Sequence, residues 1–196
     1  MRVVKYPHPI LEYHSKPLRK IDQTVRDIVA EMFELMYDNA GVGLAANQVG
    51  LPYQIVVLNP TGSREHREEE TVLINPTILK LKGGNENGEE GCLSFPGLRM
   101  LVSRAKEIKF QAVDLNGQLQ TYFWDGLKAR IAQHETDHLF GKCFYQRANA
   151  SITPNPELFL SKMSQEFQKN VKAGLEPTKE QFLEEVARLE SERSQL

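Results

Sequence analysis

The segment Gln133–His138, with the sequence QHETDH, contains the pattern H-E-x-x-H and constrains the fold more than any other part of the chain. On an α-helix, residues i and i+4 lie on one face about one turn apart, so both imidazoles can reach a single ion. Glu135 then lies about 100° round the helix, where it can contact a metal-bound water without ligating the metal. Residues 126–140 have a helical pattern of their own that ends at Gly141. The chain is therefore predicted to fold around a helix that presents two histidines to a metal.

A third ligand is required, because a catalytic metal usually has three protein ligands and one open position. Metallopeptidases with this pattern take the third ligand from a downstream Glu or His, but no His follows His138 and the next Glu is Glu157. A thiolate is the remaining ligand type, and the chain has two cysteines, Cys92 and Cys143. Cys143 stands beside Phe144 in an apolar stretch, which favours a small buried core residue. Cys92 stands in the glycine-flanked segment GEEGCLSFPG, an expected irregular loop, and is the better candidate.

A glycine-rich segment, GVGLAANQVG at residues 41–50, is the third unusual feature. It lacks the Gly-Lys-Ser/Thr end of a phosphate-binding loop and the strand-turn-helix order of a dinucleotide site. Its only polar side chains are Asn47 and Gln48, both amides with donor and acceptor groups. The spacing does not choose between them, and either can simply tie down the loop.

The order of apolar and turn residues predicts an α+β fold, with mixed or antiparallel sheets around a central metal-binding helix and a C-terminal helical extension. We expect another helix at residues 24–39, and strands at 54–59, 72–74, 77–81, 98–102, 107–114 and 118–124. Pro76 marks a strand edge or bulge, and Asn116-Gly117 marks a hairpin turn. The charged residues 61–70 are expected to form an exposed loop and resemble a local insertion.

Beyond Pro154 the composition changes. Residues 156–173 and 178–193 are rich in Glu, Lys, Gln and Leu, and their spacing predicts two amphipathic helices separated near Gly174. The simplest interpretation is a helical cap packed on the sheet, and a tail that docks another protein is the alternative.

Length and charge exclude several classes of protein. A chain of 196 residues corresponds to about one domain. The net charge of −2 gives no reason to expect binding to nucleic acid or to a membrane. The first 20 residues lack a secretory signal, and no apolar run is long enough to span a bilayer. The predicted location is therefore the cytoplasm, where both cysteines are expected to be thiols.

Three segments together resemble the signature motifs of the peptide deformylase family. They are GVGLAANQ at 41–48, EGCLS at 90–94 and QHETDHLFG at 133–141, and the similarity extends over residues 1–147, including Tyr6–Pro9. The resemblance implies a metal-dependent hydrolase that removes the formyl group from the N-terminal formyl-methionine of nascent polypeptides and releases formate. It assigns residues 1–150 to a deformylase-like catalytic domain and residues 151–196 to a helical extension of that domain.

The resemblance also implies a role for each motif residue. Cys92, His134 and His138 are expected to ligate one divalent metal, most often Fe²⁺ in vivo, with Zn²⁺, Ni²⁺ or Co²⁺ as alternatives. A metal-bound hydroxide attacks the formyl carbon, with Glu135 as general acid and base. The side chain of Gln48 and the backbone N–H of Leu93 form the oxyanion site.

Substrate contacts follow from the same resemblance. Backbone groups of Val42, Gly43 and Gly91 are expected to pair with the peptide main chain, as an added strand does. Val42, Leu127 and Ile131 are expected to contribute to the pocket for the methionine side chain. Glu90, Arg104 and Asp137 are candidates for orienting the metal ligands, with an ordinary structural role as the alternative.

The tail departs from the family pattern. Family members often continue with Asp-Arg-Leu and then stop or add a basic helix, whereas this chain has Gln146-Arg147-Ala148 and, after Asn155, six Lys or Arg against eight Glu. The ribosome is therefore at most a weak partner. Two alternatives to a deformylase stay open, an H-E-x-x-H metallopeptidase and a structural zinc protein or inactive binding module. A purely structural site needs neither Glu135 nor Gln48.

Overall fold

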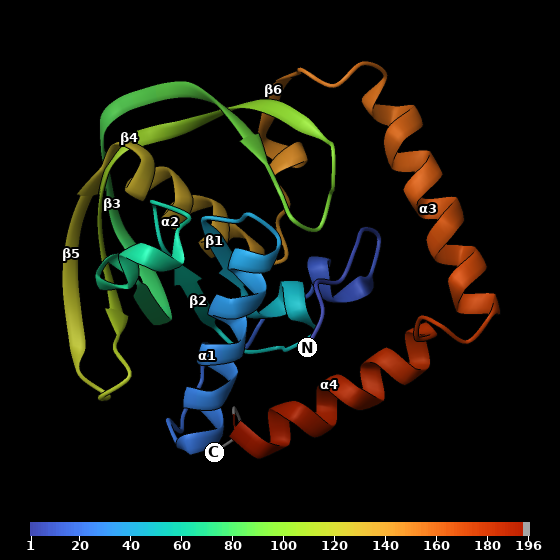
Figure 1. The fold of residues 1–196 in the computed structure, drawn as a ribbon, viewed down its shortest axis with the longest axis horizontal. Helices are drawn as coiled ribbons and strands as arrows, with labels where there is room; N and C mark the ends of the chain where they lie inside the picture. The colour runs from blue at the N-terminus through green and yellow to red at the C-terminus, as the bar shows by residue number, and fades with distance from the viewer. Residues whose placement is uncertain (194–196) are drawn as a thin grey trace.

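The computed structural model describes residues 1–193 and contains one antiparallel sheet with helices on both of its sides (Figure 1). The strand order is β1–β2–β3–β4–β5, and β6 also pairs with β4. The strands are β1 (Gly43–Ala45), β2 (Ile55–Leu58), β3 (Thr71–Gly91), β4 (Arg99–Val113), β5 (Leu119–Asp125) and β6 (Ala148–Ser151). The α-helices are α1 (Gln23–Asp38), α2 (Gly126–Leu139), α3 (Pro156–Lys172) and α4 (Lys179–Arg193). The predicted α+β class is confirmed, and every pairing between these strands is antiparallel.

The strands β3 and β4 are longer than the sequence pattern predicts. The separate strands expected at 72–74 and 77–81 belong to one strand that continues to Gly91, and those expected at 98–102 and 107–114 merge into β4. Gly83 and Gly84, with φ of 74° and 70°, occupy a register shift where the chain bends without losing its partner strand. The expected bulge at Pro76 is present as another register shift between Ile74 and Thr77.

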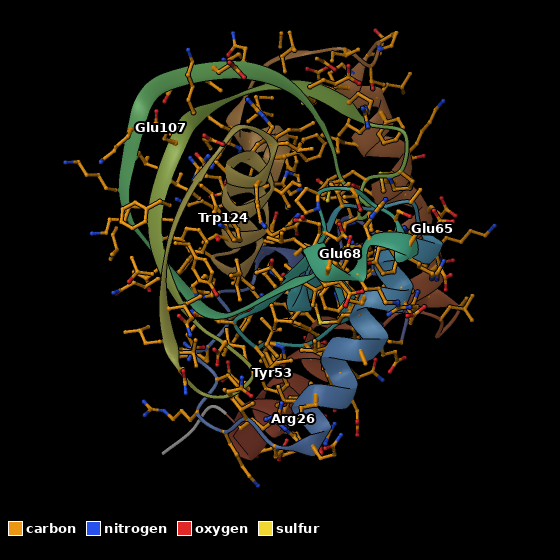
Figure 2. All side chains as sticks on the ribbon, turned by 60° about the vertical axis from the view of Figure 1, so that its left-hand side comes forward. Arg26, Tyr53, Glu65, Glu68, Glu107 and Trp124 are labelled. Atoms are coloured by element: carbon orange, nitrogen blue, oxygen red, sulfur yellow. The ribbon has the colours of Figure 1, made fainter. Side chains whose placement is uncertain are left out.

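The helix α2 lies against the inner face of the sheet, and β3 and β4 curve over it (Figure 1). Ala129, Ile131 and Ala132 pack with Ile108 and Phe110 of β4. All nine residues from Ile131 to Leu139 are buried. Figure 2 shows Trp124 on the side of the sheet that faces α2 and Glu107 on the outer side. The packing therefore carries the H-E-x-x-H segment into the interior.

The charged segment 61–70 is exposed as expected but is not an irregular loop. It contains a short 3-10 helix, η3 (Arg64–Glu69), whose N-cap is the side chain of Ser63. Arg64 and Arg67 both pair with Glu34 of α1, at 3.0 and 2.6 Å. Local capping and ion pairs to α1 therefore order a segment that has no apolar periodicity of its own.

The two C-terminal helices form as predicted, but they do not cap the sheet. Phe182 and Val186 of α4 pack with N-terminal residues such as Ile10, and Leu189 joins the core around α1. The helix α3 has no buried residue. The extension therefore covers the N-terminal segment and the N-terminal end of α1, because its buried apolar stripe is on α4. Among residues 1–193, no helix has both the length and the apolar character needed to cross a bilayer.

Phe182 is expected to be the main anchor of α4. Its ring contacts those of His8 and Tyr13, each with centroids 5.9 Å apart, and its side chain is 7% exposed. Replacing Phe182 with alanine should lower the free energy of unfolding by about 3 kcal/mol, since a buried aromatic ring is lost and a cavity remains. Urea unfolding measures this, with the exposed neighbour Leu183→Ala as the matched control. Equal losses in the two variants would contradict the assigned packing.

Candidate metal centre

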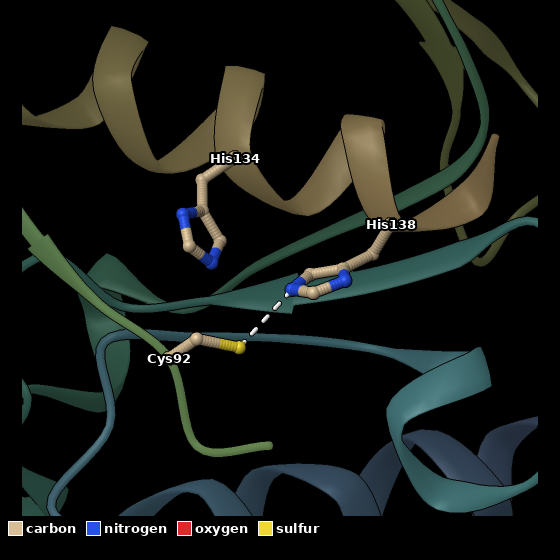
Figure 3. Close-up of side chains that lie close together, drawn as sticks. All are labelled: Cys92, His134 and His138. Carbon is tan, nitrogen blue, oxygen red and sulfur yellow. Dashed lines mark hydrogen bonds between the residues drawn. The ribbon is translucent and has the colours of Figure 1, made fainter. Parts of the chain in front are cut away.

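Cys92, His134 and His138 bring one sulfur and two imidazole nitrogens together in the interior. One ligand atom from each residue lies within 4.8 Å of the others, and Sγ of Cys92 is 3.2 Å from Nε2 of His138. Figure 3 shows both imidazoles projecting from α2 toward Cys92. The pairing expected from the i, i+4 spacing is confirmed, and Cys92 supplies the third donor.

The two cysteines have different environments, although residues 88–91 of the irregular loop expected around Cys92 belong to β3. Cys92 is the first residue after β3 and begins a turn in which the N–H of Phe95 donates to its carbonyl oxygen at 2.9 Å. Cys143 is buried in an apolar cluster with Leu11 and Phe144, and burial raises the pKa of its thiol. Neither is in a disulfide. Cys143 is therefore a core residue, and Cys92 is a metal ligand.

The donor set fits a divalent transition metal. Burial holds the pKa of His138 well below its ordinary value. Burial also lowers the pKa of His134, but hydrogen bonds with Cys92 and Glu90 outweigh it and raise this pKa to about 10. A thiolate and two imidazoles at this separation suit zinc or iron.

Glu90 orients the imidazole of His134 by binding the ring nitrogen Nδ1. Its Oε2 accepts hydrogen bonds from Nδ1 of His134 at 2.8 Å and from Arg104 at 3.0 Å, and its Oε1 accepts from Nε of Arg104 at 3.0 Å. Burial alone would raise the pKa of Glu90, but these bonds hold it well below its usual range. Because Nδ1 is engaged, Nε2 of His134 is the nitrogen that faces the metal position.

Arg104 pairs with both Glu90 and Asp137, and each of these carboxylates also binds a second arginine that the sequence did not single out. Arg130 donates to Oε1 of Glu90 at 2.8 Å, and Arg147 donates to Oδ1 of Asp137 at 2.6 Å. Arg130 precedes His134 by four residues on α2, so helical spacing was an available signal. Arg147 lies beyond the helix end, and only the fold brings it to Asp137.

Glu135 is buried beside the three ligands. Its Oε2 has no hydrogen-bond partner within residues 1–193. Burial is the main cause that raises its pKa, to about 7, and the charge of Glu90 adds to this effect. A Cβ at Gly43 would lie 2.6 Å from Oε1 of Glu135, so only glycine allows β1 to approach this carboxylate so closely. The arrangement leaves one buried carboxylate oxygen beside the metal ligands without a partner among the described residues.

The two amides of the glycine-rich segment have different partners. Oε1 of Gln48 accepts from the N–H of Ala45 at 2.8 Å, and its Nε2 donates to Sγ of Cys92 at 3.2 Å. The side-chain amide of Asn47 instead donates to the carbonyl oxygen of His138. Gln48 therefore presents an N–H group to the metal position, whereas Asn47 ties the segment to α2.

A cavity of about 490 Å³ opens at Cys92 and His134. The sequence-predicted residues in its wall are Val42, Gly43, Gln48, Glu90, Gly91, Cys92, Leu93, Leu127, Ile131, His134 and Glu135. His138 is fully buried and does not line the cavity, and its Nε2 lies 3.2 Å from Sγ of Cys92. The cavity also includes Lys5, which no sequence pattern singled out. The cavity is large enough for a peptide end beside the metal position.

Comparison with known proteins gives a consistent result. Residues 1–153 match the family model described as polypeptide deformylase. A peptide deformylase of Rhodopirellula baltica is 44% identical over 147 residues, which cover 75% of this chain and 72% of that protein. The chloroplastic peptide deformylase 1B of Oryza sativa is 41% identical over 152 residues, 78% of this chain and 56% of that longer protein.

The fold agrees as well. The crystal structure of peptide deformylase from Plasmodium falciparum superposes with a TM-score of 0.81 and 32% identity, and covers 86% of this chain and 98% of that chain. The part matched by the family model ends close to the start of α3. On the family match, the sequence identity and the geometry of the three donors, the chain belongs to the peptide deformylase family, and Cys92, His134 and His138 form its metal site.

Proposed function

We propose that this deformylase acts on the N-terminal formyl-methionine of nascent polypeptides and releases formate. The observation that carries the proposal is the position of Glu135, a buried carboxylate beside the three metal ligands with one oxygen unpaired within residues 1–193. A structural metal site has no use for such a group, since an unpaired buried carboxylate oxygen costs free energy. A hydrolytic site requires one, to accept and return a proton.

The roles proposed for the chain's own residues follow from their geometry. Cys92, His134 and His138 would hold a divalent metal, which would lower the pKa of a bound water toward neutrality and so supply a nucleophile at ordinary pH. Glu135 takes the proton of the attacking water and delivers it to the departing amine. The Nε2–H of Gln48 and the N–H of Leu93 stabilise the charge that develops on the formyl oxygen. The bond from Ala45 supports this role of Gln48, because it fixes which end of the amide faces the site.

The peptide is proposed to bind as an added strand between Gly43 and Gly91. The carbonyl oxygen of Val42 accepts a bond from the N–H of Asn59 at 2.9 Å, on the side of β2. Backbone groups alternate in direction along a strand, so those of Gly43 point away from β2 toward the cavity. Ile131, Leu127 and the Val42 side chain form the apolar wall proposed for methionine.

The identity of the metal and the location in the cell are further parts of the proposal. Ferrous iron is the physiological metal we propose, since a thiolate with two imidazoles suits iron and zinc alike and the family uses iron. A cytoplasmic location is proposed from the free thiol that the site requires. The balance of six Lys or Arg against eight Glu after Asn155 supports no strong attachment to the ribosome.

A formate assay with metal analysis tests the function. Protein purified without oxygen should contain about one metal ion per chain and release formate from a formyl-methionyl tripeptide. Chelation should abolish formate release, and addition of Fe²⁺ should restore it. An unformylated tripeptide that is cleaved at its peptide bond would support the metallopeptidase alternative instead. Metal-loaded protein that releases no formate would overturn the proposed function.

A further inference from the structure

The N-terminal segment, residues 3–6, runs between the two segments that carry the proposed oxyanion donors. The N–H of Val4 donates to the carbonyl oxygen of Gln48 at 2.8 Å, and the N–H of Tyr6 donates to that of Ser94 at 3.0 Å. Gln48 belongs to the glycine-rich segment and Ser94 to the turn after β3. One short piece of chain therefore sets the separation between two segments that are distant in sequence.

Lys5 lies between these two contacts and reaches into the site. Its Nζ donates to the carbonyl oxygen of Leu93 at 2.7 Å, and its side chain lines the cavity that also contains Cys92 and Glu135. Lysine ammonium groups usually extend into water, where they are fully hydrated. Burial lowers the pKa of Lys5 from its ordinary value. The ammonium group of a lysine in a cavity wall loses part of its hydration. This cost suggests a function in the site besides fixing the N-terminal segment.

We propose that Lys5 is a positioning residue for deformylation, which holds the Leu93 main chain so that its N–H points at the formyl oxygen. This inference rests on the proposed role of Gln48 and Leu93 as oxyanion donors. The N–H and the carbonyl group of Leu93 flank the same Cα, so fixing the carbonyl restricts the dihedral angles that aim the N–H. A cation in the cavity wall also favours the negative charge that develops nearby, because charge is screened less there than in bulk water.

The expected effect is on the chemical step. The donors act on charge that is present mainly in the transition state, so their misalignment lowers kcat and leaves KM largely unchanged. A displacement of about 1 Å in a catalytic group can cost about 100-fold in rate. Loss of the Lys5 contact should therefore lower kcat by about 10-fold to 100-fold.

Three variants of the 196-residue chain separate the effect of the contact from the effect of the charge. Lys5→Met removes both the donor and the charge at similar length, Lys5→Gln keeps a neutral donor, and Lys5→Arg keeps both. We expect the lowest kcat for Lys5→Met, an intermediate value for Lys5→Gln and rescue by Lys5→Arg to within about threefold of wild type. KM for a formyl-methionyl tripeptide and the metal content per chain should stay near the wild-type values.

The exposed Lys16 supplies a matched control, because Lys16→Met makes the same change in the same part of the chain outside the cavity. Metal content and thermal unfolding are measured for every variant. The proposal is overturned if Lys5→Met keeps the wild-type kcat, or if its loss merely follows a loss of metal or of folded protein. If Lys5→Met does not fold, equal kcat values for Lys5→Gln and Lys5→Arg overturn it. Absence of formate release in wild type and Lys16→Met alike would overturn the proposed function itself.

Discussion

Replacing Glu135 with glutamine is expected to leave the metal bound and to lower kcat by about 10³-fold. The three ligands do not include Glu135, so metal content should stay at about one ion per chain. Glutamine has nearly the same size and fits beside Gly43, but it cannot accept a proton from water or return one to the amine. Metal analysis and single-turnover formate release on the same sample test both parts of this prediction.

A second glutamate provides the control for this experiment. Glu86 in β3 is exposed and outside the cavity, so Glu86→Gln should keep the wild-type kcat. Wild-type turnover in Glu135→Gln would refute the proposed mechanism while leaving the metal site intact. Loss of metal together with turnover would instead show that Glu135 acts mainly on the ligands.

A small stabilisation of Glu135→Gln toward urea is also expected, because a neutral amide is less costly to bury than an ionised carboxylate.

Replacing Cys92 with serine is expected to remove most of the metal and nearly all activity. A serine hydroxyl is not deprotonated near neutral pH and is a poor ligand for iron or zinc, so two imidazoles remain as donors. Activity measured without added metal should fall by more than about 100-fold. Equilibrium dialysis against Fe²⁺ or Zn²⁺, followed by metal analysis, gives the affinity directly.

Cys143→Ser is the matched control, since it makes the same change at a cysteine that the fold buries in the core. It should keep about one metal per chain but lower the free energy of unfolding by about 1–3 kcal/mol, because a buried hydroxyl needs a hydrogen-bond partner. The metallopeptidase alternative predicts that Cys92→Ser changes the metal content little. Equal metal loss in both cysteine variants would contradict the distinction between them.

The site was largely predictable because its main signal is local. Two histidines at i and i+4 must share a helical face, and a cysteine between glycines has an accessible backbone around it. The choice between Asn47 and Gln48 was not available in the sequence, since both are amides. It depends on which amide meets Cys92 and which meets His138, and that is decided by the packing of η2 (Ala46–Val49) against α2.

The fold was less predictable where strands are exposed on both faces. From Leu79 to Glu89, β3 has no buried residue, so the alternation of apolar and polar positions that identifies a strand is absent. Backbone pairing with β4 keeps this part of β3 extended instead. Lys5 was missed for a different reason. Its contact with Leu93 joins residues 88 positions apart in the sequence, and no hydrophobic periodicity or motif marks such a contact.

The complete burial of α2 from Ile131 to Leu139 has a consequence for mutational tolerance. Gln133 has no direct part in the proposed chemistry, yet its side-chain amide accepts from the N–H of Ala105 at 3.1 Å and donates to the carbonyl oxygen of the same residue at 2.9 Å. The side-chain amide of Gln133 thus bonds both main-chain groups of Ala105 in β4, as a neighbouring strand would. In a saturation library, Gln133 should be as intolerant of substitution as its neighbour His134. The turn of helix that carries the metal would therefore diverge slowly during evolution on structural grounds alone.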